Sequence, residues 1–198
     1  MTKYILNSGN TKSFPEKEQT YYQEILKGPS KNPRILSCFF AQPREDWEER
    51  FLTQSENFRG RTLLPDLSIE LAFPKTFEKQ VRQSDIIIFH GGDDHLLHYW
   101  LSKFDLSSLV EGKTVAGSSA GANVLCKYFW TCDWREAMDG LGLLPIKFIP
   151  HFNSTTYAEN DPRGPINWSV AYKELKSYGD TSLPIHTPEE GDFIILEK

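Results

Sequence analysis

The stretch VAGSSAGANVLCKY, residues 115–128, places glycine, serine and alanine between an apolar lead-in and a second apolar run. Within it, residues 117–121 match the pattern Gly-x-Ser-x-Gly, which follows a predicted strand and precedes a predicted helix. In that setting the pattern is typical of a sharp turn that strains its central serine and exposes the hydroxyl. Side chains at Gly117 or Gly121 would collide with neighbouring backbone. We therefore predict that Ser119 is a nucleophile; the alternative is a turn that only packs a helix closely on a sheet.

Short apolar runs alternate with helix-like segments on both sides of this turn. The pattern Ser13-x-x-Glu16 predicts a capping box that starts a helix ending near Lys27. Further strands and helices follow in turn: strands at 3–6, 34–40, 67–73, 85–90 and 114–118, helices at 44–58, 76–83, 94–103 and 120–129, then a strand in IKFIPHF, a helix around Val170 and Leu175, and two strands joined through the turn PEEG.

This alternation predicts an α/β fold. We expect a three-layer sandwich whose mostly parallel central sheet is flanked by helices, as in flavodoxin-like proteins, in a single domain over residues 1–198. In such sheets, functional groups gather at the carboxyl ends of the parallel strands. Ser119 follows one of those ends.

The composition argues against several classes of function. The chain carries a formal net charge of −5 with acids and bases interspersed, so no basic run offers a surface for nucleic acid. The sequence has no run of about 18 apolar residues and no signal-like apolar segment at its start. Three cysteines without C-x-x-C spacing are expected to be buried thiols. We expect a soluble, cytoplasmic protein with no nucleic-acid or membrane partner.

A serine hydroxyl needs a base to take its proton, and the base needs a third group to orient it. His151 follows the predicted strand in IKFIPHF and comes after the serine in sequence, so we predict that it is the base. Three acids lie between serine and histidine, and their positions do not rank them: Asp133, Glu136 and Asp139. One oxyanion donor would be the N–H of Ala120, and the other would come from Gly91-Gly92 at the end of the neighbouring strand.

A metal site is the main rival on chemical grounds. Asp94, His95 and His98 lie at helical spacing with His90 close by, and such ligands suit zinc, but no known local metal signature is matched. An α/β-hydrolase esterase would share the serine turn. Its acid, however, is expected after further strands rather than within about twenty residues of the serine.

Three blocks, HGGDDHLL, GSSAGANVLC and GLGLLPIKFIPHF, resemble in order and spacing peptidase E, the aspartyl dipeptidases of peptidase family S51, and their relatives the cyanophycinases. The resemblance covers most of the chain and implies a class I glutamine amidotransferase-like fold. It implies that Ser119 is the nucleophile, His151 the base, and Gly92 with Ala120 the oxyanion donors. Asp133 would be the third triad member, with Glu136 in reserve.

The resemblance also implies an activity, which is hydrolysis of dipeptides with an N-terminal aspartate through an acyl-enzyme, with no metal and no other cofactor. Small peptides are the expected substrates, and a homodimer is left open. Gly91 and Asp93 are candidate substrate contacts, and Arg163 is a candidate clamp for a carboxylate, with a solvated surface arginine as the alternative.

The chain departs from the family around the glycine block. Relatives have three glycines followed by Asn-Thr where this chain has residues 90–94, HGGDD, and an aromatic residue where it has Ser118. The added acids would repel an aspartyl carboxylate unless a cation offsets them. A catalytically silent binding protein that retains the fold is therefore the alternative function.

Overall fold

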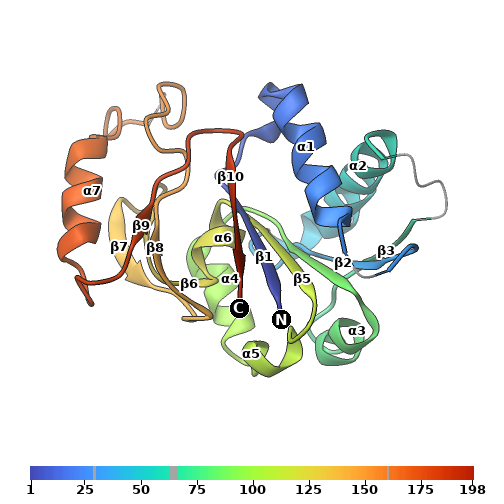
Figure 1. Cartoon of the computed structure of the whole chain (residues 1–198). Coiled ribbons are helices and arrows are strands. Elements are labelled where there is room, and N and C mark those ends of the chain that lie inside the picture. Colours follow the sequence, from blue (N-terminus) through green and yellow to red (C-terminus); the bar gives the residue numbers. More distant parts are fainter. Residues whose placement is uncertain (29, 63–66, 160) are drawn as a thin grey trace.

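The computed structural model describes residues 1–28, 30–62, 67–159 and 161–198. Its strands form two sheets, one of six strands and one of four (Figure 1). The strand order of the larger sheet is β10-β1-β5-β4-β2-β3, and only the edge strand β10 runs antiparallel to its neighbour. The bounds are β1 Lys3–Asn7, β2 Arg34–Cys38, β3 Ser68–Leu71, β4 Ile86–Phe89, β5 Thr114–Ser118 and β10 Phe193–Glu197.

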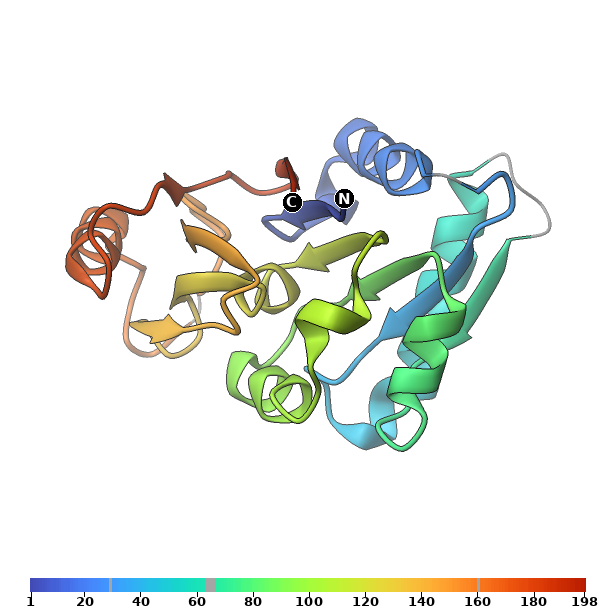
Figure 2. The same cartoon turned by 60° about the horizontal axis from the view of Figure 1, so that its bottom comes forward.

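Helices cover both faces of the six-stranded sheet (Figure 2). The helices α1 and α2 lie on one face, and α3, α4 and α5 lie on the other. Their bounds are α1 Pro15–Leu26, α2 Trp47–Gly60, α3 Phe77–Gln83, α4 Asp94–Leu101 and α5 Leu106–Leu109, with 3-10 turns at Thr11–Ser13 and Arg44–Asp46. The predicted three-layer α/β sandwich with a mostly parallel sheet is confirmed.

The strand sequences explain these layers because successive side chains point to opposite faces of a sheet. Ile5 and Ile88 pack with α1 and α2, whereas their neighbours Leu6 and Phe89 pack in the core on the other face. Parallel strands covered on both faces read as continuous apolar runs, as in Ile86–Phe89. Each such side chain, fully buried, contributes about 1.5–3 kcal/mol to folding.

The four-stranded sheet has the order β7-β6-β8-β9 and packs against α7. Buried Lys147, in β8, donates hydrogen bonds of 2.6–3.1 Å to the carbonyl oxygens of Leu175, Lys176 and Tyr178, which ties the end of α7 to the sheet. The bounds are β6 Cys126–Thr131, β7 Glu136–Asp139, β8 Leu144–Phe148, β9 Ile185–His186 and α7 Trp168–Ser177.

Two local predictions are wrong. The helix predicted at residues 120–129 is only the short α6, Ala120–Asn123, because the aromatic-rich run Cys126–Thr131 forms β6 instead. The capping box is also absent: Phe14 occupies the N-cap of α1, and the Ser13 hydroxyl donates to Asn10 Oδ1 at 2.8 Å. The wrong helix prediction at residues 120–129 arises because an apolar run of that length does not by itself distinguish a helix from a strand.

Two other expectations concern composition. All three cysteines are buried and free, as expected. Among the described residues, we find no helix with both the length and the apolar content to cross a membrane.

Candidate active site

The serine turn has the strained geometry that its sequence predicts. Ser119 lies between β5 and α6 with φ 51° and ψ −114°, a conformation that residues with a side chain rarely adopt. A Cβ on Gly117 would lie 2.4 Å from the carbonyl oxygen of Gly121, and one on Gly121 would lie 2.0 Å from that of Phe89. Both glycines are therefore required by close backbone contact.

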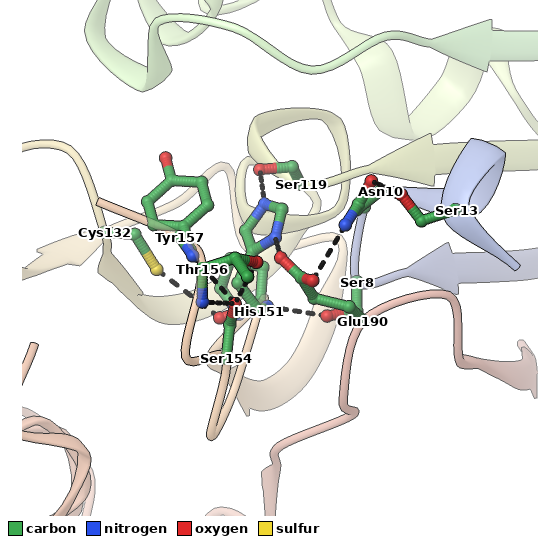
Figure 3. Close-up of polar contacts among 12 residues, drawn as sticks. Ser8, Asn10, Ser13, Ser119, Cys132, His151, Ser154, Thr156, Tyr157 and Glu190 are labelled. Carbon is green, nitrogen blue, oxygen red and sulfur yellow. Dashed lines mark hydrogen bonds and ion pairs between the residues drawn. The ribbon is translucent and has the colours of Figure 1, made fainter. Parts of the chain in front are cut away.

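His151 meets this serine from the other sheet. It follows β8, and its Nε2 lies 3.0 Å from Ser119 Oγ (Figure 3). The histidine is buried, has φ 53°, and donates its backbone N–H to Ser8 Oγ at 2.6 Å. A Cβ on Gly9 would lie 2.4 Å from His151 Cε1, so this glycine leaves the space that the imidazole occupies. The structure thus brings the two predicted residues into hydrogen-bonding contact.

The carboxylate at the other side of the imidazole is Glu190. Its Oε1 lies 3.1 Å from His151 Nδ1, and its Oε2 accepts a 2.8 Å hydrogen bond from Asn10 Nδ2 (Figure 3). Asn10 is itself oriented by the Ser13 hydroxyl, which donates to its Oδ1. Both carboxylate oxygens therefore have partners, which fixes the acid beside the ring.

Strand register explains why Glu190 reaches this place. Ser118, the last residue of β5, pairs with Asn7, the last residue of β1, and Asn7 also pairs with Phe193, the first residue of β10. Because β10 is antiparallel, its start lies at the carboxyl end of the parallel strands. The turn that precedes β10 is therefore beside Ser119. In sequence this segment, PEEG, reads only as a turn.

The surroundings shift the pKa of His151. Burial lowers it below its ordinary 6.5, and the hydrogen bond and charge of Glu190 oppose that effect. The lowering keeps the imidazole neutral near pH 7, which is the form that can accept a proton. The carboxylate favours the imidazolium that would then form.

The acids predicted from sequence lie elsewhere. Asp133 Oδ1 accepts a hydrogen bond from the hydroxyl of Tyr157, and the Tyr157 ring stacks on His151 with centroids 4.2 Å apart. Glu136 Oε1 lies 4.0 Å from His95 Nε2 and is exposed. The carboxylate hydrogen-bonded to the His151 ring is Glu190 instead, and Asp133 adds only its charge, which raises the pKa of His151. Asp139 ends β7 and is exposed.

The glycine block lies against the serine turn. A Cβ on Gly91 would lie 3.3 Å from Ser119 Cβ, so the two loops are in close contact. Gln42 Nε2 donates to the carbonyl oxygen of Gly91. Because a trans peptide directs its C=O and N–H oppositely, this bond orients the N–H of Gly92 away from Gln42. In the described part of the chain, no backbone or side-chain acceptor is found for the N–H of Gly92 or Ala120.

The predicted substrate contacts have structural partners of their own. Asp93 is the N-cap of α4, and its Oδ1 accepts from the N–H of Leu96 at 2.8 Å. Arg163 is bound to Asp161 through Nε and Nη2, and Nη2 also donates to the carbonyl oxygen of Asp133 at 2.8 Å. These bonds hold the loop that carries Tyr157. They occupy the guanidinium that sequence predicts as a carboxylate clamp.

The residues of the metal alternative are not brought together. His90 lies 2.7 Å from Ser37 Oγ and stacks on Phe39, while buried Asp94 accepts from Asn123 Nδ2 at 3.0 Å. His95 lies edge-on to Trp134. Among the described residues, no group of three or more potential metal ligands is assembled.

The fold is an α/β sandwich that brings a serine, a histidine and a carboxylate into sequential contact at the strand ends, an arrangement typical of serine hydrolases. Comparison with known families gives the family itself. The profile of peptidase family S51 matches residues 5–171, and the chain belongs to that family. Membership supports a peptidase and confirms the resemblance seen in the sequence. A search of curated proteins finds no match.

Solved structures support the same fold. A peptidase from an acI-B1 Actinobacterium is 21% identical with a TM-score of 0.63, and the alignment covers 99% of this chain and 83% of the other. A protein provisionally named peptidase E from Listeria monocytogenes EGD-e is 15% identical with a TM-score of 0.65, covering 100% and 99%. At these identities the similarity concerns the fold.

Proposed function

We propose that this protein is a serine peptidase that cleaves small peptides through an acyl-enzyme. The observation that carries the proposal is the continuous contact from Ser119 Oγ to His151 Nε2, 3.0 Å, and from His151 Nδ1 to Glu190 Oε1, 3.1 Å. Ser119 is the nucleophile, His151 the base, and Glu190 the acid that orients the base. This assignment differs from the sequence expectation of Asp133 or Glu136.

The proposed reaction has two halves. Ser119 Oγ attacks the scissile carbonyl carbon while its proton passes to His151 Nε2, and the carbonyl oxygen becomes an oxyanion bound by the N–H groups of Gly92 and Ala120. The C–N bond then breaks, and His151 returns the proton to the leaving amine. Water, deprotonated by the same imidazole, hydrolyses the ester of Ser119 and restores the serine.

Glu190 sets the tautomer in this scheme. Because its carboxylate accepts a hydrogen bond from the N–H at Nδ1, the imidazole presents an unprotonated Nε2 to the serine. Asn10 keeps the carboxylate in place through the other oxygen. The strained backbone of Ser119 holds the hydroxyl ready before substrate arrives, so little reorganisation accompanies the attack.

Covalent labelling tests the proposal directly. A fluorophosphonate should label the wild-type protein, and Ser119→Ala should abolish the label and peptide hydrolysis while keeping the fold. Ser118→Ala is the matched control, since it removes the neighbouring hydroxyl, and it should still be labelled. An unlabelled but folded wild type would favour the silent binding protein. Hydrolysis of Asp-Leu compared with Ala-Leu is the first substrate comparison.

A further inference from the structure

A cavity lies beside the serine turn, beneath α1 and α2. Its inner part has a volume of about 80 Å³ and is lined by apolar side chains of both helices and of the sheet, among them Tyr22, Ile35, Phe58 and Ile88. It adjoins a cleft of about 540 Å³. Both spaces are lined by Ser118 and His90, so the inner cavity is reached past the residue that precedes the nucleophile.

Two buried hydroxyl groups line the inner cavity without a partner. The Tyr21 hydroxyl and Ser55 Oγ, each in a residue only 4% exposed, have no hydrogen-bond acceptor or donor within reach among the described residues. A buried polar group left unpaired costs roughly 1–3 kcal/mol. These groups are therefore unsatisfied until water or a ligand atom occupies the cavity.

The cavity carries no net charge. Among the described residues that line its inner part, His90 is the only one that could be charged near pH 7, and burial lowers the pKa of His90 to about 3. The outer cleft has opposite charges in balance, Lys12 and Arg50 against Asp46 and Glu49. An ionised side chain would lose its hydration in the inner cavity without gaining a partner.

The cavity shares no lining residue with the groove beside Glu190. The leaving amine must be near His151, which gives it a proton, and the groove on that side is lined by Glu190 and Phe152. The inner cavity is formed by β2, β4, α1 and α2, away from that groove. Asn10 lines both the cleft and the groove and so lies between the two sides.

Resting on the proposed peptidase function, we propose that this cavity is the specificity pocket for the residue on the acyl side of the cleaved bond. It selects an uncharged side chain of medium length, such as leucine, methionine or glutamine, over aspartate and over alanine. The volume accommodates several non-hydrogen atoms, as a space for several waters would. A polar tip such as that of glutamine would also satisfy the two unpartnered hydroxyls.

Dipeptides X-Leu with X as Gln, Met, Leu, Ala or Asp test the pocket. We expect kcat/KM for at least one medium-length uncharged residue to exceed that for Ala-Leu and Asp-Leu by about tenfold or more, the scale of discrimination that a few buried atoms provide. Asp-Leu or Ala-Leu cleaved as well as all three would overturn the proposal.

Variants that fill the cavity link this preference to the pocket. Ser55→Leu should reduce the preference to less than about threefold, whereas Ser107→Leu, the same exchange at an exposed site on α5, should keep it. Ile69→Phe, at a half-buried position in the lining, narrows the cavity independently should Ser55→Leu not fold. A preference unchanged in the folded filled variant would contradict the assignment.

Binding separates this inference from the proposed catalysis. Ser119→Ala cannot form an acyl-enzyme, so calorimetry with Gln-Leu, Met-Leu, Leu-Leu and Asp-Leu measures pocket selectivity whether or not the wild type cleaves peptides. Tighter binding of an uncharged dipeptide by about tenfold supports the pocket even if fluorophosphonate labelling fails. Equal affinities for these dipeptides together with successful labelling would support the proposed peptidase function and contradict the proposed specificity pocket.

Discussion

The Tyr157 ring stacks on the His151 imidazole, with centroids 4.2 Å apart and planes inclined by 28°. The Tyr157 hydroxyl donates to Asp133, and Arg163 binds the Asp133 carbonyl oxygen and Asp161. These contacts connect the loop after β8 to the β6–β7 turn. Asp133, the acid expected from sequence, is therefore bonded to the residue that stacks on the imidazole, and its charge raises the pKa of His151 without direct contact.

Tyr157 is expected to position His151. Tyr157→Ala removes the stacked ring and should lower kcat by about 10²-fold, since misplacing a catalytic group by 1 Å has an effect of that size. Tyr157→Phe keeps the ring and removes only the hydrogen bond to Asp133, so it should lower kcat much less than Tyr157→Ala does. Asp133→Asn should also lower kcat little, because its amide oxygen can still accept that hydrogen bond. Steady-state kinetics of the three variants checks this. An Asp133→Asn loss as large as that of Glu190→Gln would return Asp133 to the triad.

Glu190→Gln should lower kcat/KM by on the order of 10³- to 10⁴-fold. The amide can donate to Nδ1, which favours the tautomer whose Nε2 already carries a proton and cannot accept one from Ser119. Glu189→Gln is the matched control, because Glu189 is the exposed neighbour in the same turn, and it should be nearly silent. Activity of the Glu190 variant within tenfold of wild type would contradict the role.

The pH dependence of kcat/KM should follow His151. The base is active when neutral, so the rate should rise with pH through a pKa below 6.5, the direction in which burial shifts it. Glu190 raises that pKa by its hydrogen bond and charge, and Glu190→Gln should therefore move the acidic limb to lower pH. A neutral N-blocked ester keeps substrate ionisation out of the profile. An acidic limb above 6.5 in wild type would refute this.

The glycines of the serine turn should be irreplaceable for folding. Gly121→Ala places a Cβ 2.0 Å from the carbonyl oxygen of Phe89, and we expect a loss of about 3 kcal/mol or more in unfolding free energy, or no folded protein. Gly60→Ala, at the end of α2 with no atom within 4 Å of the new methyl group, should gain up to about 1 kcal/mol. Urea denaturation followed by circular dichroism distinguishes the two.

Asp94 should make the protein less stable as pH rises. Its pKa is raised from 3.8 to about 6, mainly by burial, so the folded state holds a proton that the unfolded state has lost between these values. Stability from this group is therefore highest below pH 4 and falls by at most about 3 kcal/mol as pH rises through 6.

Asp94→Asn should remove that loss. Asn123 donates to Asp94, and its Oδ1 has no hydrogen-bond partner among the described residues, so the new amide could donate to it. The variant should therefore have a higher free energy of unfolding than wild type at pH 8, and the difference between the two proteins should be smaller at pH 4. Urea unfolding at both pH values measures this, and a gain that is equal at the two would exclude Asp94 as the cause.

The local parts of the site were predictable because they depend on neighbouring residues. Gly117, Ser119 and Gly121 form one turn, and their residue types report the close backbone contacts directly. The place of His151 directly after an apolar strand indicates its position at the strand ends. The layers of the main sheet followed from apolar runs such as Ile86–Phe89.

The part of the site that the sequence does not predict depends on pairing between distant segments. Glu190 reaches His151 because β10 pairs antiparallel with β1, a register that no local pattern in PEEG encodes. Asn10 and Ser13 escape prediction for a related reason: the pattern Ser13-x-x-Glu16 is typical of a helix cap, whereas the Ser13 hydroxyl binds a residue of the preceding loop. Gln42, which orients the Gly91–Gly92 peptide, carries no motif.

Ser119 is carried by the six-stranded sheet, and His151 by the loop that leaves the four-stranded sheet. The distance between Ser119 Oγ and His151 Nε2 therefore depends on how tightly the two sheets pack against each other. Mild denaturant or heat that loosens this junction would disconnect the pair while each sheet stays intact. Peptide hydrolysis would then be lost before spectroscopic signs of unfolding appear. A mutation far from the cleft would abolish activity if it disturbed only the contact between the two sheets.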